Sequence, residues 1–74
     1  MTRLPQIDAA RLIRALKRAG FVEHEFRGSH LTLKHPTKDL RTTVPKHSGD
    51  LDRGLMKAIL KQAGLTEDEF RKLL

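Results

Sequence analysis

The spacing of the apolar residues changes twice along the chain, and this change limits the folds that the chain can adopt. Apolar residues recur at three- and four-residue intervals in residues 9–16, at two-residue intervals within residues 22–44, and again at the longer intervals in residues 55–63. The longer interval is the period of an α-helix and the shorter one that of a β-strand. The sequence therefore predicts a helix, a group of strands and a second helix, in that order.

The first predicted helix has recognisable signals at both ends. Asp8 is the expected N-cap, Ile7 and Leu12 are placed as a hydrophobic staple, and Gly20 is the expected stop. The face expected to pack on the core consists of Ala9, Leu12, Ile13 and Leu16. These positions make an amphipathic helix that ends before Phe21.

Residues 21–36, FVEHEFRGSHLTLKHP, have the pattern of a β-hairpin. Gly28 supplies the turn, with either Arg27 and Gly28 or Gly28 and Ser29 as its central residues, and the alternation gives the same faces for both turns. The inward face is expected to carry Val22, Phe26, Leu31 and Leu33. The outward face is expected to carry Glu25, Arg27, His30, Thr32 and Lys34. His30 is thus predicted to point away from the core.

A turn at residues 36–39 leads to a third predicted strand over residues 40–45. Pro45 ends this strand because proline cannot donate to the ladder. The inward residues are expected to be Leu40, Thr42 and Val44.

Two further helices follow a polar loop. The second helix is expected to begin at the N-cap Asp52 and to end at Gly64, and Thr66 with Glu69 forms a capping box for a short third helix. The apolar stripe of the second helix consists of Leu55, Met56, Ile59, Leu60 and Ala63. The predicted fold class is α+β, with a three-stranded antiparallel sheet, helices on one of its faces and a short C-terminal helix, in a single domain of residues 1–74.

The composition favours a polyanionic partner. The 74 residues carry 15 Lys and Arg against 9 Asp and Glu, which gives a net charge of +6. Such a field attracts nucleic acid, an anionic membrane or an acidic protein. Three Phe are the only aromatic residues, which disfavours a surface that stacks single-stranded bases. The basic residues Arg11, Arg14 and Arg18, with Lys17 nearby, are most simply a solvated helix face.

Other features of the composition point to a cytoplasmic protein. The chain has no cysteine, which excludes disulfides and thiolate metal sites and fits a reducing compartment. No apolar run approaches the length of a membrane span, and the first residues lack the apolar centre of a signal peptide.

Most kinds of catalytic site are disfavoured by the residues present. The four histidines lack the spacing and the additional ligands of a metal site, so no metal or other cofactor is expected. Ser29 and His30 are neighbours in sequence, so their side chains point to opposite faces of a strand and make a poor nucleophile–base pair. No glycine-rich phosphate loop is present.

Metal-free RNA cleavage needs less, because the 2′-hydroxyl of RNA is itself the nucleophile. The protein must move a proton near neutral pH, for which an imidazole such as His30 is suited, and stabilise charge on the phosphorane. Arg27, Lys34 and Arg41 could supply that positive charge, and His47 is a candidate phosphate contact. An exposed histidine on a strand is nevertheless most often only a surface residue.

The chain resembles the HicA family of toxins, the toxin half of HicBA toxin–antitoxin pairs. The resemblance rests on four segments in order and covers nearly the whole chain: LIRALKRAGF in the first helix, RGSHLTLKHP in the hairpin, TVPKH at the third strand, and GLMKAILKQAGLTEDEF at the end. It implies a fold like that of the double-stranded RNA-binding domain, mRNA cleavage that does not need the ribosome, and neutralisation by a cognate HicB antitoxin.

The resemblance also assigns residues. The glycine-serine-histidine motif of the family falls on Gly28, Ser29 and His30, and it implies that His30 is the catalytic histidine. Gly28 and Ser29 are therefore expected to bind substrate, and the charge argument adds Arg27, Lys34, Arg41, Lys46 and His47 to the expected substrate-binding residues. No second catalytic group is identified.

Two other functions fit the sequence. One is a non-catalytic RNA-binding module, which would recognise the shape of double-stranded RNA with a basic helix face. The other is an inactive domain whose only partner is an antitoxin. His30 distinguishes these functions from an enzyme, because a module that only binds has no need of an imidazole at that position.

Overall fold

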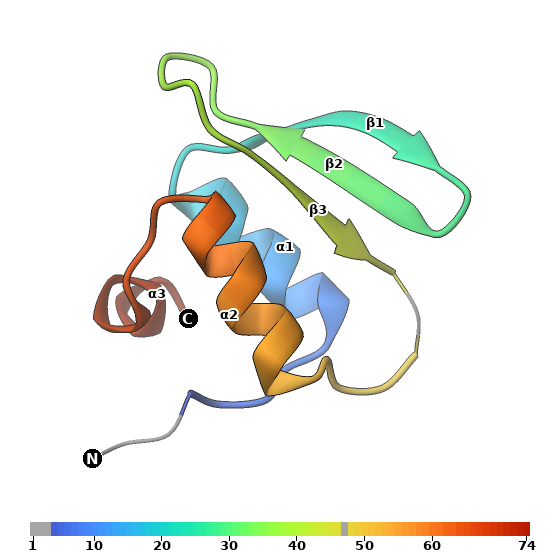
Figure 1. The fold of residues 1–74 in the computed structure, drawn as a ribbon, viewed down its shortest axis with the longest axis vertical. Helices are drawn as coiled ribbons and strands as arrows, with labels where there is room; N and C mark the ends of the chain where they lie inside the picture. Colours follow the sequence, from blue (N-terminus) through green and yellow to red (C-terminus); the bar gives the residue numbers. More distant parts are fainter. Residues whose placement is uncertain (1–3, 47) are drawn as a thin grey trace.

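The computed structural model describes residues 4–46 and 48–74, and it has the predicted order of elements (Figure 1). The elements are α1 (Ala9–Arg18), β1 (Val22–Arg27), β2 (His30–Lys34), β3 (Arg41–Pro45), α2 (Arg53–Gln62) and α3 (Glu67–Leu73). The strands form one antiparallel sheet in the order β1-β2-β3. The α+β fold class and the three-stranded antiparallel sheet are therefore confirmed.

Helix starts lie where the sequence places them because each start has a side chain that accepts a free backbone N–H group. Asp8 accepts from the backbone of Arg11, and Asp52 accepts from that of Leu55. Thr66 and Glu69 form the complete capping box of α3. Gly20, with φ of 103°, follows α1 in a backbone conformation that favours glycine.

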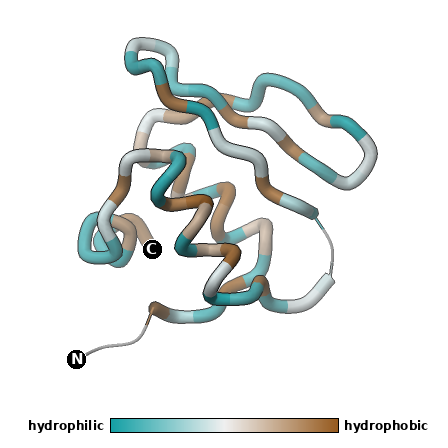
Figure 2. The backbone as a smooth tube through the Cα atoms, in the orientation of Figure 1, coloured by the Kyte–Doolittle hydropathy of each residue, from teal (hydrophilic) through white to brown (hydrophobic). Residues whose placement is uncertain are grey.

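The sheet and the helices enclose one hydrophobic core. Figure 2 shows hydrophobic stretches along α1, α2 and the strands. The most deeply buried side chains are Leu12, Leu16, Leu33, Val44, Leu51, Met56, Leu60 and Phe70. Thr42 is the polar exception, and its Oγ1 lies 2.8 Å from Oε1 of Gln62 in α2. This hydrogen bond satisfies the buried hydroxyl, so the inward placement of Thr42 is not costly.

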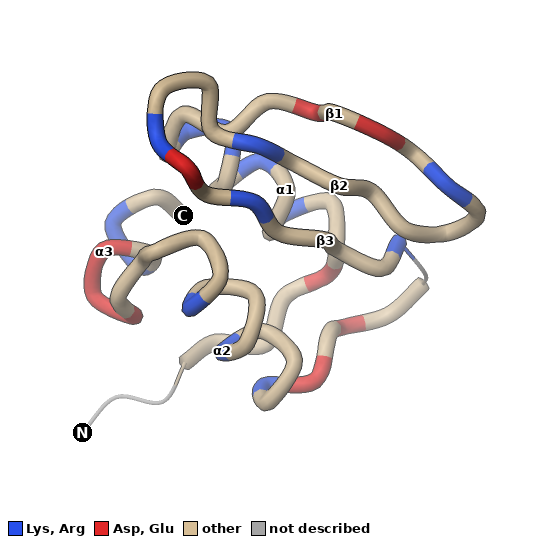
Figure 3. The backbone as a smooth tube through the Cα atoms, turned by 45° about the horizontal axis from the view of Figure 1, so that its top comes forward, with Lys and Arg blue, Asp and Glu red and all other residues tan. Residues whose placement is uncertain are grey.

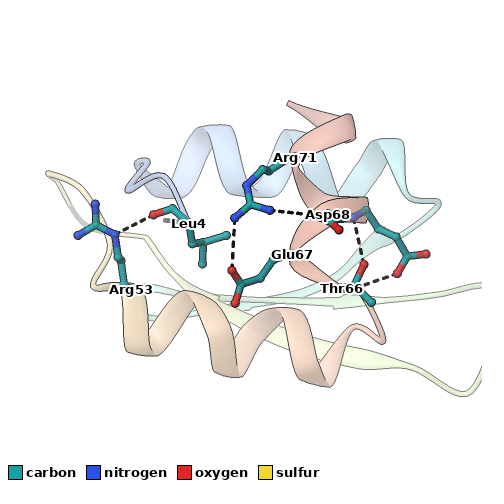
Figure 4. Close-up of polar contacts among 7 residues, drawn as sticks. Leu4, Arg53, Thr66, Glu67, Asp68 and Arg71 are labelled. Carbon is teal, nitrogen blue, oxygen red and sulfur yellow. Dashed lines mark hydrogen bonds and ion pairs between the residues drawn. The ribbon is translucent and has the colours of Figure 1, made fainter. Parts of the chain in front are cut away.

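Further polar contacts tie Leu4 to α2 and stabilise α3 internally (Figure 4). Nε of Arg53 donates to the carbonyl oxygen of Leu4 at 2.7 Å, which ties the first described residue to α2. In α3, Arg71 reaches both Glu67 and Asp68. The contact between Arg53 and Leu4 holds the first described residues against the helix layer, whereas the pairs of Arg71 lie within α3 itself.

Strand β1 departs from the predicted alternation. The register shifts between Glu23 and Glu25, so His24 has no partner residue in β2. Because one extra residue reverses the faces on its far side, Val22 pairs with Lys34 on the open face while Glu23 pairs with Leu33 on the helix side. The prediction that Val22 points inward is therefore wrong.

Two other predicted core positions are also exposed. Phe26 lies on the helix side, opposite Leu31, but it is 55% exposed. The helices pack closest to β3, and β1 is the edge strand on the other side of the sheet. Leu55, in the first turn of α2, is 36% exposed. The third strand begins at Arg41 rather than at residue 40, and Leu40 packs half-buried against the core.

None of the helices formed by residues 4–46 and 48–74 is long and apolar enough to span a membrane.

Candidate functional site

His30 is the first residue of β2 and follows a two-residue hairpin loop. Arg27 and His30 pair across the hairpin, so Gly28 and Ser29 are the central turn residues, which settles the choice between the two predicted turns. Gly28 has φ of 60°, and the non-glycine Ser29 has a negative φ. A positive φ at the first central residue alone is characteristic of a type II′ turn, which suits a tight hairpin. A Cβ on Gly28 would meet nothing within 4 Å, so the backbone angle alone favours glycine there.

The pairing of β2 with both neighbours places His30 in a row across the open face. The row runs Arg27, His30, Pro45. Pro45 has no N–H group, so its pairing with His30 is of the non-hydrogen-bonded kind, in which facing side chains lie closer. The backbone N–H of Lys46 donates to the carbonyl oxygen of Ser29 at 2.6 Å and extends the ladder past Pro45. The backbone at His30 is thus held from both sides.

The imidazole of His30 is exposed, as predicted, and it lies on the open face. Within residues 4–46 and 48–74, its ring has no hydrogen bond or ion pair. A ring without such contacts can turn toward a bound ligand and can exchange a proton with it directly.

Arg27 lies beside His30 and is itself almost fully in solvent. Its side chain is 84% exposed, and its Nη2 lies 2.9 Å from Oε2 of Glu25, which shares the open face. An exposed ion pair of this kind contributes little to stability. It does bring a carboxylate next to the Arg27–His30 row, on the face where the alternation of the sequence had placed Glu25.

The predicted substrate-binding residues do not form one cluster (Figure 3). Lys34 and Arg41 face each other at the far end of β2 and β3. Lys34 lies four positions after His30 in β2, a distance of about 13 Å along the strand. The row between them contains Thr32 and Thr43, whose Oγ1 atoms are 3.3 Å apart. The open face therefore has a basic group at each end and hydroxyl groups between them.

Lys46 lies on the other side of the sheet, and its Nζ lies 5.4 Å from the centre of the Phe26 ring. This cation–π contact places it near the hairpin end but under the open face rather than on it. Ser29 is exposed in the turn. His47, the remaining predicted contact, lies outside the described residues.

The other two described histidines have different surroundings. His24 is exposed at the bulge of β1. His35 follows β2 directly, and its Nδ1 accepts hydrogen bonds from the backbone N–H groups of Thr37 and Lys38, each at 3.2 Å. Its ring meets Phe21 edge-on, with 5.4 Å between ring centres. His35 therefore stabilises the turn between β2 and β3, a role that the sequence did not reveal.

Two carboxylates have their pKa shifted by identifiable partners. Lys17 of α1 forms an ion pair with Glu23 beneath β1 and lowers the pKa of that carboxyl, mainly through the hydrogen bond between them. The capping hydrogen bonds with Thr66 lower the pKa of Glu69. Both groups act in folding and lie away from the open face.

In the described part of the chain, no three His, Cys, Asp or Glu side chains gather in a group that could hold a metal ion. The expectation of metal-free chemistry stays a prediction.

Comparison with known families shows which family the chain belongs to. Residues 9–65 match the family model described as the HicA toxin of bacterial toxin–antitoxin systems. The chain belongs to the HicA toxin family. The match includes all three strands, His30 and α2, and it implies a cognate antitoxin as partner of this HicA-family chain. No curated protein matches the sequence.

Proposed function

We propose that this HicA-family chain is an endoribonuclease that cleaves mRNA through His30, without a metal ion and without the ribosome. The observation that carries the proposal is the imidazole of His30. It is exposed at the start of β2, without a hydrogen bond or ion pair to any described residue, and His30 pairs across the hairpin with Arg27. The family match supports the same function.

The proposed reaction breaks the bond between phosphorus and the 5′-oxygen of the next nucleotide. The 2′-oxygen attacks phosphorus, its proton passes to a base, and the leaving 5′-oxygen takes up a proton, which gives a 2′,3′-cyclic phosphate and a 5′-hydroxyl. His30 performs one of the two proton transfers, because imidazole can both accept and donate a proton near neutral pH. Arg27 stabilises the negative charge that develops on the phosphorane.

The open face binds the RNA backbone in this proposal. Arg27 at one end and Lys34 with Arg41 at the other contact phosphates on either side of the scissile bond, and Gly28 and Ser29 approach the backbone from the turn. Lys46 would reach the RNA from the side of the sheet that carries Phe26, and His47, which lies outside the described residues, stays a proposed phosphate contact. Such binding depends little on the RNA sequence. Its affinity falls steeply as the salt concentration rises, because each phosphate contact releases a counterion.

We further propose that the antitoxin inhibits by covering this face. The open sheet face is free of helices, and it carries His30 and its basic neighbours. An acidic antitoxin surface would be steered toward it. Hydrogen exchange on the toxin–antitoxin complex tests this proposal. Protection of residues 28–34 is expected, and protection confined to α1 would contradict it.

One alternative is a module that binds RNA without cleaving it. The positions of Lys34 and Arg41 favour this alternative. They lie about 13 Å along the strands from His30, which suits binding of the RNA backbone but is too far for a part in the reaction at His30. A domain that only docks an antitoxin is the third possibility, and it would show neither RNA cleavage nor RNA binding.

Cleavage assays with purified protein in EDTA separate the enzyme from the two other functions, and RNA-binding assays then separate those two from each other. The enzyme is expected to cut RNA, to leave a 2′,3′-cyclic phosphate and to spare a substrate with a 2′-deoxy nucleotide at the scissile position. The matched control for His30→Ala is His24→Ala, because both histidines are exposed in the same hairpin. Dependence on Mg²⁺, cleavage of the 2′-deoxy substrate or full activity of His30→Ala would refute the proposal.

A further inference from the structure

The outer face of α1 presents a second set of basic side chains. Arg11, Arg14 and Arg18 follow one another at three- and four-residue spacing, so they lie on one side of the helix, and all are exposed. Together with Leu74 they line a shallow hollow. We refer to Arg11, Arg14 and Arg18 as the α1 arginine face. Figure 3 shows blue segments, which mark Lys and Arg, along α1.

The charges of this face are not neutralised by the fold. In residues 4–46 and 48–74, none of its guanidinium groups pairs with a carboxylate, whereas the neighbouring Lys17 pairs with Glu23. Arg18 Nη1 donates to the carbonyl oxygen of Leu73 at 2.6 Å, which leaves its positive charge in place.

The nearby carboxylates of α3 already have partners. Arg71 pairs with Glu67 and Asp68, and Glu69 is used in the cap of α3. Like charges at this spacing destabilise a helix by a few tenths of a kcal/mol for each pair. The repulsion within the α1 arginine face therefore opposes helix formation slightly. A contribution to folding does not explain why three arginines lie there.

We propose that the α1 arginine face binds phosphate groups of the RNA backbone, as an anchoring site separate from His30. The proposal extends the proposed function, since it concerns the same RNA substrate. Guanidinium groups bind phosphate oxygens through paired hydrogen bonds, and a row of them suits a linear polyanion. No aromatic side chain lines the hollow, so the site holds the backbone and does not stack bases.

The position of the site makes a specific demand on the RNA. The α1 arginine face belongs to the helix layer, whereas His30 lies on the opposite, open face of the sheet. An oligonucleotide that is too short to pass around the domain, whose extents are 34 × 28 × 17 Å, contacts only one of the two faces. A longer RNA that passes around the domain can occupy both sites, and the second contact then forms at high effective concentration. The α1 arginine face should therefore strengthen the binding of long RNA only.

Binding measurements on a His30→Ala background test the proposal without interference from cleavage. The test variant adds Arg11→Gln and Arg14→Gln and keeps Arg18, because Arg18 holds the carbonyl of Leu73. The matched control instead adds Lys57→Gln and Lys61→Gln, which removes the same charge from exposed positions of α2. Each protein is titrated with an RNA of about 60 nucleotides and with one of about 3, lengths chosen so that only the first can span both sites.

The test variant is expected to lose about 10-fold in affinity for the long RNA, and its salt dependence should flatten by about 1.5 in the slope of log affinity against log salt. Its affinity for the short RNA should stay within about 2-fold, and the control should change as little with both RNAs. Circular dichroism verifies that both variants keep their helices.

Three results would overturn the proposal. Unchanged binding of the long RNA by the test variant is one, and an equal loss in the α2 control is another, because it would mean that only the total charge matters. The third is unchanged RNA binding together with weakened binding of the antitoxin, which would make the α1 arginine face a protein-binding surface. None of these results depends on whether His30 cleaves RNA, so this proposal and the proposed enzyme can fail separately.

Discussion

The two histidines at the ends of β2 have opposite surroundings. His35, after the last residue of the strand, is half-buried, accepts two backbone hydrogen bonds and packs against Phe21. His30, the first residue of the strand, is exposed and has no hydrogen bond or ion pair to any described residue. The fold thus uses one imidazole as a structural acceptor and leaves the other available to a ligand. Residue type alone would have treated the two as equivalent candidates.

This difference predicts that the two histidines respond in opposite ways to removal. His30→Ala should lower the rate of RNA cleavage about 10²- to 10⁴-fold, because it removes a proton-transfer group. Its melting temperature should stay close to that of the wild type, since the ring makes no contact that the fold needs. Cleavage rates and thermal melts of the same preparation measure both quantities. A large fall in melting temperature would assign His30 a structural role instead.

His35→Ala should have the reverse effect. It deprives the N–H groups of Thr37 and Lys38 of their acceptor and removes the ring from Phe21, so the free energy of unfolding should fall by about 1–3 kcal/mol. Cleavage per folded molecule should stay near the wild-type value. Urea denaturation gives the stability, and activity is corrected for the folded fraction. Loss of cleavage with unchanged stability would break the comparison.

A smaller effect distinguishes the two ends of the open face. Arg27→Gln should lower the cleavage rate about 10-fold, because Arg27 lies in the same row as His30 and stabilises the phosphorane. Lys34→Gln removes the same charge at the far end of the face, so it should raise KM by about 3-fold and leave kcat nearly unchanged. Steady-state kinetics separate the two parameters. Equal effects on kcat would show that distance from His30 does not matter.

The smallest expected effect concerns Glu23, whose carboxylate forms an ion pair with Lys17 of α1. The hydrogen bond and charge of Lys17 lower its pKa below the ordinary value of 4.5, so the unfolded chain binds the proton more tightly than the folded one. The stabilisation is therefore complete above the ordinary pKa and is lost as the pH falls through the lowered pKa. Glu23→Gln should melt slightly below the wild type at pH 7, and the two curves should converge in acid. A gap that persists in acid would mean that Lys17 is not the cause.

Local signals in the sequence predicted most of the fold. The caps at Asp8, Asp52 and Thr66 each depend on residues within one helical turn, and all are found where expected. The bulge at His24 was missed because it depends on the pairing between β1 and β2. The alternation of apolar and polar residues within one strand does not show which residue is left unpaired. Val22 consequently lies on the open face and not in the core.

The candidate site was predictable to a similar extent. The outward direction of His30 follows from alternation counted from the turn, and it holds for either turn that the sequence allowed. The separation of Lys34 and Arg41 from His30 requires the register of all three strands, and the position of Lys46 beneath Phe26 requires the end of β3. The role of His35 depends on its contact with Phe21, a residue that is distant from it in the sequence.

The most direct test of the central claim is rescue of the His30→Ala protein by free imidazole. Because His30 is exposed on an open face, an imidazole molecule from solution can occupy the space left by its ring. The rate of RNA cleavage by His30→Ala should be near background without imidazole and should rise with imidazole concentration, at the bond that the wild type cuts. His35→Ala should show no such increase. Cleavage by His30→Ala at the wild-type rate without imidazole would contradict the claim that His30 carries the reaction.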